Sequence, residues 1–250
     1  MTAWFDTARL GLFVHWGHSS QRGIELSWPM VGGNPALPRP EPITVDDYHA
    51  TAATFDPRQW DARDLARRAK RMGAQYAILT AKHHDGYAMF DTKLSEFSVM
   101  RSPYGRDIFR EFAEAMRAEG VRAGVYYSLS DWHHPDYPPF TEADKPYNFM
   151  KLPQPTPEGW QRYLDFLFGQ VRELLTNYGR IDIVWFDGHW ERPLTQWRAK
   201  ELAAMIRELQ PGILINDRLP GEGDYETPEQ FVPPKPPSHR WETCMTMNGS

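Results

Sequence analysis

Short apolar runs alternate with amphipathic stretches along this 250-residue chain, a pattern that predicts an α/β fold of strand–helix units on a parallel sheet. No apolar run is followed by G-x-G-x-x-G, which argues against a dinucleotide-binding sheet. Reactive side chains also follow most of these runs, always at the same end. The sequence therefore favours a (β/α) barrel of the TIM type that is truncated after about six strands.

Six apolar segments are expected to be strands, at residues 10–17, 75–83, 122–129, 181–187, 212–219 and 240–247. A closed barrel of this type has eight strands, so six strands would leave two sheet edges open. We therefore expect a second copy of the chain to close the gap in a homo-oligomer.

Four helices are expected between the strands, at residues 60–73, 106–120, 158–179 and 195–212. Asp61 is a suitable N-cap for the first helix, and Gly73 lies at its end. Residues 220–238 are rich in proline and are expected to form a long ordered loop. Since no repeat or low-complexity linker divides the chain, we expect one catalytic domain over residues 1–250.

The composition excludes several classes of protein. A net charge of -5 without a basic run argues against binding to nucleic acid or to an anionic membrane surface. No apolar run approaches the ~20 residues of a membrane span. The first residues lack the basic and apolar regions of a signal peptide, so a cytoplasmic location is expected. The single cysteine, Cys244, excludes an internal disulfide.

Polar, reactive side chains lie at or just beyond the carboxyl ends of five predicted strands. They are His15 and Trp16; His83, His84 and Asp85; Tyr126, Tyr127 and Ser128; Asp187; and Asn216, Asp217 and Arg218. In a (β/α) barrel these ends meet on one face, where active sites are built. A buried carboxylate such as Asp187 costs several kcal/mol unless partners stabilise it, so we expect it at the rim of a pocket.

Two chemistries fit such a pocket. Glycoside hydrolysis needs two carboxylates; Asp187 supplies one, and Glu229 and Glu242 are the candidates for the other. Metal-assisted hydrolysis is the alternative, because nine histidines and several aspartates could hold zinc. The sequence lacks H-E-x-x-H, however, and has no H-x-H on the first strand, so we expect no metal site and no cofactor.

Five segments resemble, in order, the motifs of the α-L-fucosidases of glycoside hydrolase family 29. They are "GLFVHWGHSS", "YAILTAKHHDGYAMFDT", "GVYYSLSDWHHPDY", "IDIVWFDG" and "LINDRLPGEGDYETPEQ". The resemblance implies an irregular (β/α)8-like barrel that hydrolyses terminal α-L-fucosides with retention of configuration and without a metal. Members of the family usually continue with a closing strand, a helix and often a β-sandwich, which we expect this chain to lack.

The resemblance also implies roles for individual residues. Asp187 matches the nucleophile, and Glu229 matches the acid/base, with Glu242 as the second choice and otherwise a sugar contact. The residues that match fucose-binding positions are His15, His83, His84, Tyr127 and Arg218. Trp28 and Trp185 could cover the apolar face of the sugar. Many family members carry glutamate before the tryptophan at position 28, whereas Ser27 stands there in this chain.

The expected partner is a fucosylated oligosaccharide or glycoconjugate. Two alternatives remain open at this point. The chain could be a fucose-binding protein with little turnover because it is truncated, or it could be a metal-dependent hydrolase barrel.

Overall fold

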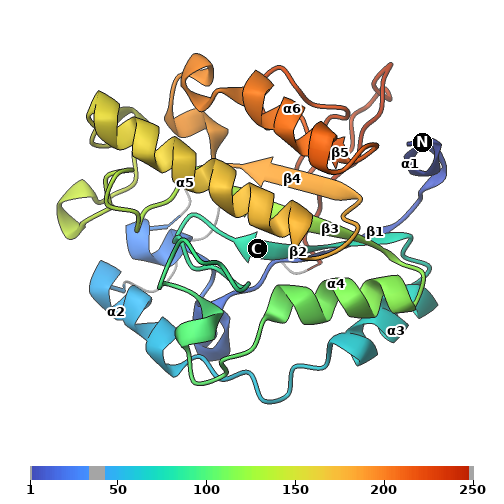
Figure 1. Ribbon diagram of the computed structural model, residues 1–250, viewed down its shortest axis with the longest axis horizontal. Coiled ribbons are helices and arrows are strands. Elements are labelled where there is room, and N and C mark those ends of the chain that lie inside the picture. Colours follow the sequence, from blue (N-terminus) through green and yellow to red (C-terminus); the bar gives the residue numbers. More distant parts are fainter. Residues whose placement is uncertain (1, 34–42, 248–250) are drawn as a thin grey trace.

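A five-stranded parallel sheet forms the centre of the protein in the computed structural model, which describes residues 2–33 and 43–247 (Figure 1). Its strands are β1 (Gly11–Val14), β2 (Tyr76–Lys82), β3 (Arg122–Ser128), β4 (Ile183–Asp187) and β5 (Leu214–Ile215). They lie in the order β1-β2-β3-β4-β5. A doubly wound sheet reverses its strand order, whereas sequential order is that of a barrel wall. The predicted parallel α/β class is confirmed.

Six α-helices are found in the described residues. They are α1 (Ala3–Thr7), α2 (Val45–Ala50), α3 (Ala62–Met72), α4 (Ile108–Ala118), α5 (Pro157–Thr176) and α6 (Ala199–Leu209). Helices α3 to α6 are the four predicted ones. Asp61 caps α3 by accepting a hydrogen bond from the backbone N–H of Asp64, as expected of an N-cap. Helices α1 and α2 were not predicted, because five or six residues are too few to show a helical period.

The two faces of the sheet have different neighbours. On the outer face, alternate strand residues such as Val125, Tyr127 and Phe186 pack in one hydrophobic core with the helices (Figure 1). On the inner face, the intervening residues form a second cluster, with Tyr126, Ile183 and Trp185 among its members. Because side chains alternate along a strand, this division decides which residues can reach a site inside the barrel wall.

The structure corrects the predicted number of strands. Residues 240–247 form no strand within the described part of the chain, where Trp241 and Cys244 make only single bridges to Glu226 and Glu229. Strand β5 is also shorter than predicted. Beyond Ile215, the side chain of Asn216 forms hydrogen bonds with the backbone of β4. Its Oδ1 accepts from the Phe186 N–H at 2.8 Å, and its Nδ2 donates to the Phe186 carbonyl at 2.9 Å. Residues 220–238 form the predicted loop.

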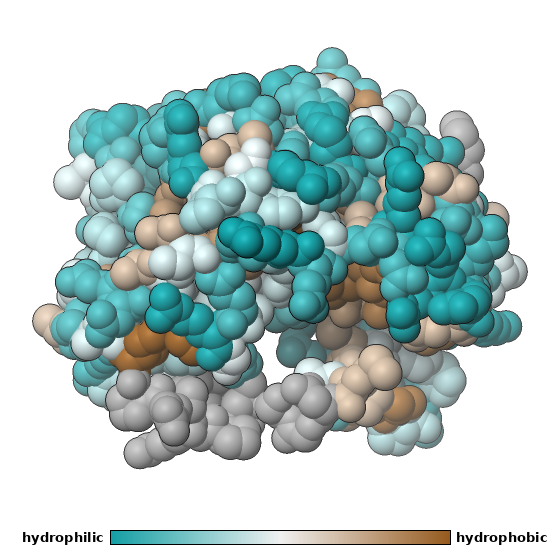
Figure 2. All heavy atoms as spheres, turned by 90° about the horizontal axis from the view of Figure 1, so that it is seen from below, coloured by the Kyte–Doolittle hydropathy of each residue, from teal (hydrophilic) through white to brown (hydrophobic). Residues whose placement is uncertain are grey.

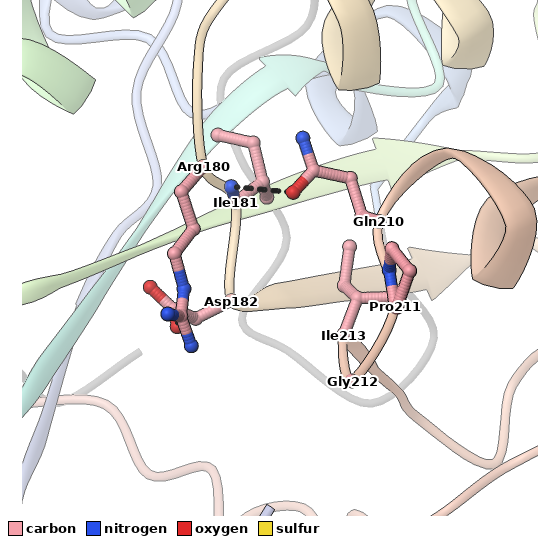
Figure 3. Close-up of a pocket in the computed structure, with 7 residues that line it drawn as sticks. All are labelled: Arg180, Ile181, Asp182, Gln210, Pro211, Gly212 and Ile213. Carbon is pink, nitrogen blue, oxygen red and sulfur yellow. Dashed lines mark hydrogen bonds and ion pairs between the residues drawn. The ribbon is translucent and has the colours of Figure 1, made fainter. Parts of the chain in front are cut away.

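A hollow of about 260 Å³ lies where β4 and β5 begin (Figure 3). Arg180 and Asp182, an ion pair at 2.9 Å, lie on one side of it, and Gln210 lies on the other. Asp187 is the last residue of β4, whereas the hollow lies at the amino-terminal ends of β4 and β5. The hollow is therefore separate from the residues predicted to form the site.

The surface is mainly polar. Figure 2 shows hydrophilic side chains over most of the face seen from below Figure 1, with apolar side chains in scattered groups. None of the helices in residues 2–33 and 43–247 combines the length and apolar character that a bilayer crossing requires.

Candidate active site

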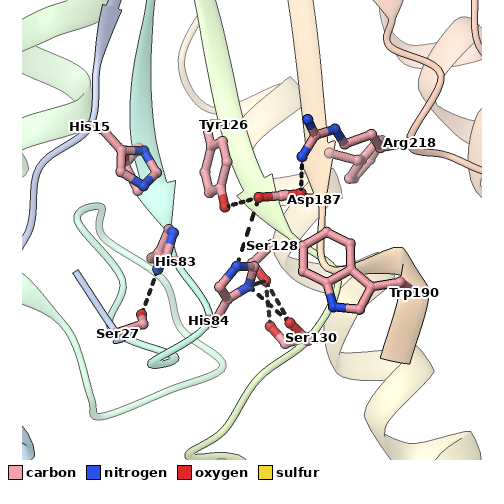
Figure 4. A network of polar contacts seen from close by, with 12 residues as sticks. His15, Ser27, His83, His84, Tyr126, Ser128, Ser130, Asp187, Trp190 and Arg218 are labelled. Atoms are coloured by element: carbon pink, nitrogen blue, oxygen red, sulfur yellow. Dashed lines mark hydrogen bonds and ion pairs between the residues drawn. The ribbon is translucent and has the colours of Figure 1, made fainter. Parts of the chain in front are cut away.

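Asp187 is the last residue of β4 and lies at the centre of a polar network at the carboxyl edge of the sheet (Figure 4). Its Oδ1 accepts a hydrogen bond from Nη1 of Arg218 at 2.6 Å. Its Oδ2 accepts from the hydroxyl of Tyr126 at 2.8 Å and lies 3.8 Å from Nε2 of His84. The carboxyl ends of β2, β3 and β5 therefore supply the partners that a buried carboxylate needs.

These partners keep the carboxylate of the buried Asp187 ionised. Burial on its own would raise its pKa, but the positive charge of Arg218 and the hydrogen bonds from Arg218 and Tyr126 lower the pKa below its usual value. The carboxylate is thus both desolvated and negatively charged at neutral pH. That combination suits a nucleophile.

Gly188 explains why the strand ends in Asp-Gly. Its φ of 76° lies in the region that favours glycine, and a Cβ there would collide with the side chain of Ser130. Ser130 is part of the site, because its hydroxyl contacts Nδ1 of His84 at 2.9 Å. Glycine at position 188 lets the chain turn sharply past this serine.

The two histidines that follow β2 are buried and neutral. Nδ1 of His84 contacts the hydroxyl of Ser128 at 2.7 Å, and Nδ1 of His83 contacts the hydroxyl of Ser27 at 2.5 Å. Burial lowers the pKa of His84 to about 4 and that of His83 well below its ordinary value. The residues described here include no group of three or more His, Cys, Asp or Glu arranged to hold a metal ion.

His15 follows β1 on the open side of the network and is exposed. Its Nδ1 lies 3.2 Å from the hydroxyl of Thr80, which fixes one edge of the ring. Its ring lies edge-on to those of His83, at 4.5 Å between centroids, and Tyr126, at 5.1 Å. The described residues make no hydrogen bond to the other edge, which can bind a hydroxyl group.

Arg218 joins the two predicted catalytic carboxylates. One of its terminal nitrogens contacts Asp187, and the other donates to Oε2 of Glu229 at 2.5 Å. The Glu229 side chain is 48% exposed, against 11% for Asp187. Glu229 therefore lies at the solvent side of the site, where a leaving group would depart.

Glu242 has a different position. Its two oxygens accept from the hydroxyl of Tyr76 at 2.5 Å and from Nε1 of Trp185 at 2.8 Å, both on the inner face of the sheet. Burial raises the pKa of its carboxyl group. Glu242 thus lies beside Trp185, two residues deeper along β4 than Asp187. In the part of the chain that the structure describes, it forms neither a hydrogen bond nor an ion pair with Arg218.

Trp185 does not offer a face to a sugar, which corrects its predicted role. It is 2% exposed, with its ring stacked on Tyr126 at 5.5 Å between centroids. The guanidinium of Arg218 lies 4.4 Å from the centroid of the Trp185 ring. The ring of Trp185 therefore stabilises the position of Arg218 through a cation–π contact.

Trp28 forms part of an aromatic wall beside His84. Its ring meets those of His84 at 5.5 Å and Tyr147 at 5.4 Å, edge to face. Trp190, which follows β4, continues the wall and donates from Nε1 to the Tyr147 hydroxyl at 2.9 Å. Trp28 and Trp190 are both partly exposed and can present apolar surface to a ligand. Trp190 was missed, because an aromatic residue in a loop gives no pattern.

Tyr127 lies outside the site, contrary to the prediction, and Tyr126 takes its place. The Tyr127 hydroxyl donates to Gln170 of α5 at 2.8 Å, on the outer face of the sheet. Strand register explains the correction: Tyr126 pairs with Trp185, which lies on the same face as Asp187 two residues later. The sequence shows that Tyr126 and Tyr127 point to opposite faces of the sheet. Only the register of β3 on β4 shows which of the two lies on the face of Asp187.

The low pKa of His84 predicts a pH-dependent stability. An unfolded histidine has a pKa near 6.5, whereas that of His84 is about 4 in the folded protein, so the unfolded state binds more protons between these values. This stabilisation is complete above about pH 6.5 and is lost as the pH falls towards 4. We expect a loss of roughly 3 kcal/mol in the free energy of unfolding from this residue.

Urea unfolding of the wild type and His84→Asn between pH 4 and 7 measures this effect. The variant should show a shallower dependence on pH than the wild type. Equal slopes for the wild type and His84→Asn would contradict the assignment.

A parallel sheet of sequential strands with two carboxylates at its carboxyl ends fits the class of (β/α)-barrel glycoside hydrolases, which use a pair of carboxyl groups at this place. Comparison with known proteins identifies the family. The sequence model described as "Alpha-L-fucosidase" matches residues 1–250, so the chain belongs to the α-L-fucosidase family.

Individual relatives agree with this assignment. The chain is 30% identical to the tissue α-L-fucosidases of Bos taurus and Homo sapiens, over 99% of its own length and 54% of theirs. The chain thus spans about half the length of these curated relatives.

Solved structures show the same fold. α-L-Fucosidase isoenzyme 1 from Paenibacillus thiaminolyticus is 40% identical with a TM-score of 0.84, and the match covers 98% of this chain and 60% of that one. A trapped covalent intermediate of a family 29 α-L-fucosidase from Bacteroides thetaiotaomicron, in complex with 2-fluoro-fucosyl fluoride, is 26% identical with a TM-score of 0.75. That match covers 95% of this chain and 57% of the other.

Proposed function

We propose that this chain carries the active site of a retaining exo-α-L-fucosidase that hydrolyses terminal α-L-fucosides of oligosaccharides or glycoconjugates. The observation that carries the proposal is the Asp187 carboxylate, buried at a strand end and kept ionised by Arg218 at 2.6 Å. The family assignment and the likeness to a trapped covalent intermediate of a relative support the same chemistry.

The proposed reaction has two steps. Asp187 attacks the anomeric carbon of the fucoside and forms an ester with it, while Glu229 gives a proton to the departing oxygen. A water molecule then attacks the same carbon and gives a proton to Glu229, and the carbon–oxygen bond to Asp187 breaks. Two inversions leave the configuration of the released fucose unchanged.

The surrounding groups have matching roles in binding. The neutral imidazoles of His83 and His84 and the exposed edge of His15 are hydrogen-bonding groups for the sugar hydroxyls, and Trp28 with Trp190 supplies an apolar wall for its ring. Release of 4-nitrophenol from 4-nitrophenyl α-L-fucoside tests the activity, and proton NMR of the first anomer formed tests retention. Formation of the opposite anomer would contradict the proposed use of Asp187.

The two alternatives are less well supported. A fucose-binding protein with little turnover would not need an ionised, desolvated carboxylate beside a second carboxylate. A metal-dependent hydrolase would need several ligands turned towards one point, whereas Nδ1 of His83 and Nδ1 of His84 are both bonded to serine hydroxyls. Binding of fucose without hydrolysis, or loss of activity on treatment with a chelator, would favour one of them instead. A homo-oligomer and a cytoplasmic location stay predictions from the sequence.

The choice of Glu229 over Glu242 as acid/base predicts a contrast between substrates. A 4-nitrophenyl leaving group needs little protonation, so Glu229→Ala should impair hydrolysis of a natural fucosyl disaccharide far more than that of the aryl fucoside. We expect a loss of about 10²- to 10⁴-fold on the disaccharide. Glu242→Ala is the matched control and should affect both substrates equally, because Glu242 is bonded to Tyr76 and Trp185. The reverse pattern would assign the role to Glu242.

A further inference from the structure

We propose that Ser27 is a positioning residue that fixes the tautomer of His83, so that this histidine presents an Nε2–H donor to the substrate. The inference rests on the proposed function for its consequence in catalysis. The tautomer itself is a property of the protein without substrate.

Ser27 lies in the connection between β1 and α2, 56 residues before His83, and it is 0% exposed. Its backbone has φ 59° and ψ -48°, which is rare for a residue other than glycine. The N–H of Trp28 donates to the carbonyl of Leu26 at 2.6 Å across it, so Ser27 is the central residue of a γ-turn of the rarer, strained form.

The surrounding structure holds this strained turn in place. The backbone N–H of Ser27 donates to the hydroxyl of Tyr48 at 2.6 Å, and that hydroxyl donates to Oδ2 of Asp85 at 2.7 Å. Both tyrosine and aspartate are buried. A strained residue that is fixed from several sides is typical of functional positions, where the geometry serves a purpose beyond packing.

Counting hydrogens assigns the direction of the contact with His83. The backbone N–H of Asp85 donates to Oγ of Ser27 at 2.9 Å, so the serine oxygen acts as acceptor on that side. Among the described residues, the remaining partner of this hydroxyl is Nδ1 of His83 at 2.5 Å. If Nδ1 carried the proton, the serine oxygen would accept twice and its buried hydrogen would have no acceptor among these residues. We therefore infer that the hydrogen points to an unprotonated Nδ1 and that the proton of the neutral ring lies on Nε2.

The protonated edge faces the site. The His83 ring is stacked on Tyr126, with 5.5 Å between centroids and 15° between planes, and it meets His15 edge-on. Figure 4 shows the Nδ1 edge turned towards Ser27 and the opposite edge on the side of His15 and Tyr126. The proton on Nε2 makes His83 a donor to a sugar oxygen, and the other tautomer would present an acceptor there.

Imidazole nitrogen NMR on the protein labelled with ¹⁵N-histidine tests the assignment without substrate. The His83 signals are identified by their absence from His83→Gln. We expect the wild type to show Nε2 protonated and Nδ1 unprotonated. Ser27→Ala and Ser27→Gly should show a changed or mixed pattern, and kcat/KM on the aryl fucoside should fall about 10- to 100-fold in both. The glycine variant tolerates the positive φ and so separates loss of the hydroxyl from loss of the fold.

Ser19→Ala is the matched control, because Ser19 is a buried serine of the same network that contacts Tyr48 at 3.2 Å and has no contact with His83. It should leave the His83 signals unchanged. An Nδ1-protonated His83 in the wild type would overturn the inference even if the protein hydrolyses fucosides. Unchanged signals in both Ser27 variants would overturn it as well. Absence of fucosidase activity, with the expected signals, would reject the proposed function and leave the tautomer assignment standing.

Discussion

Asp187→Gly is expected to lower kcat on an aryl α-L-fucoside at least about 10³-fold, the scale that follows loss of an essential catalytic group. The substitution removes the carboxylate that would form the covalent intermediate, and it leaves a space beside Arg218. Azide is small and anionic, so it should enter this space, attack the anomeric carbon in place of Asp187 and restore part of the turnover. The product should then be the fucosyl azide of inverted configuration.

Asp182, which directly precedes β4, provides a matched control. Asp182 is also a buried aspartate paired with an arginine, Arg180 at 2.9 Å, but it lies at the opposite edge of the sheet. Asp182→Gly should keep most of the activity of the folded protein and should not respond to azide. Retention of more than about a tenth of the wild-type rate by Asp187→Gly would show that another group is the nucleophile.

Arg218→Ala is expected to lower kcat/KM on the aryl fucoside by about 10²- to 10³-fold, as for loss of a buried electrostatic donor. Arg218 lowers the pKa of Asp187 against the effect of burial, so its removal should raise that pKa. The ionised form would then be reached only at higher pH. The acidic limb of the kcat/KM profile should therefore move upwards in pH.

Two further variants separate charge from geometry. Arg218→Lys keeps the positive charge but cannot bridge Asp187 and Glu229 with a planar fork, so its acidic limb should move less while kcat/KM still falls. Arg207 also pairs with two carboxylates, Glu222 and Asp224, at 3.3 Å each and away from the site. Arg207→Ala should keep the wild-type profile. An acidic limb that stays in place in Arg218→Ala would contradict the proposed role of this ion pair.

The sequence was sufficient to predict the main features that place the site. The alternation of apolar runs and helical stretches predicted the parallel sheet and its four long helices. The polar residues at the strand ends predicted that Asp187, His84 and Arg218 would meet, which they do within 4 Å. This works because parallel strands bring their carboxyl ends to one edge whatever the details of packing.

Other features depend on information that local patterns do not hold. To choose Tyr126 over Tyr127 as the site residue, one must know the register of β3 on β4. A change of one residue in this register would move each side chain to the other face of the sheet. The segment 240–247 is apolar enough for a strand, but it makes only isolated bridges with the proline-rich loop. The contact of Ser27 with His83 joins two connections far apart in the chain, so no spacing could have indicated it.

The position of the covalent bond to the sugar decides whether Asp187 is the nucleophile. The protein is incubated with 2-fluoro-fucosyl fluoride, a reagent whose intermediate has been trapped in a relative, and its mass is measured before and after digestion. We expect one fluorofucosyl group per chain, carried by the peptide that contains Asp187 and absent from Asp187→Gly. A stable adduct on any other residue, or turnover of fucosides with no adduct on Asp187, would contradict it.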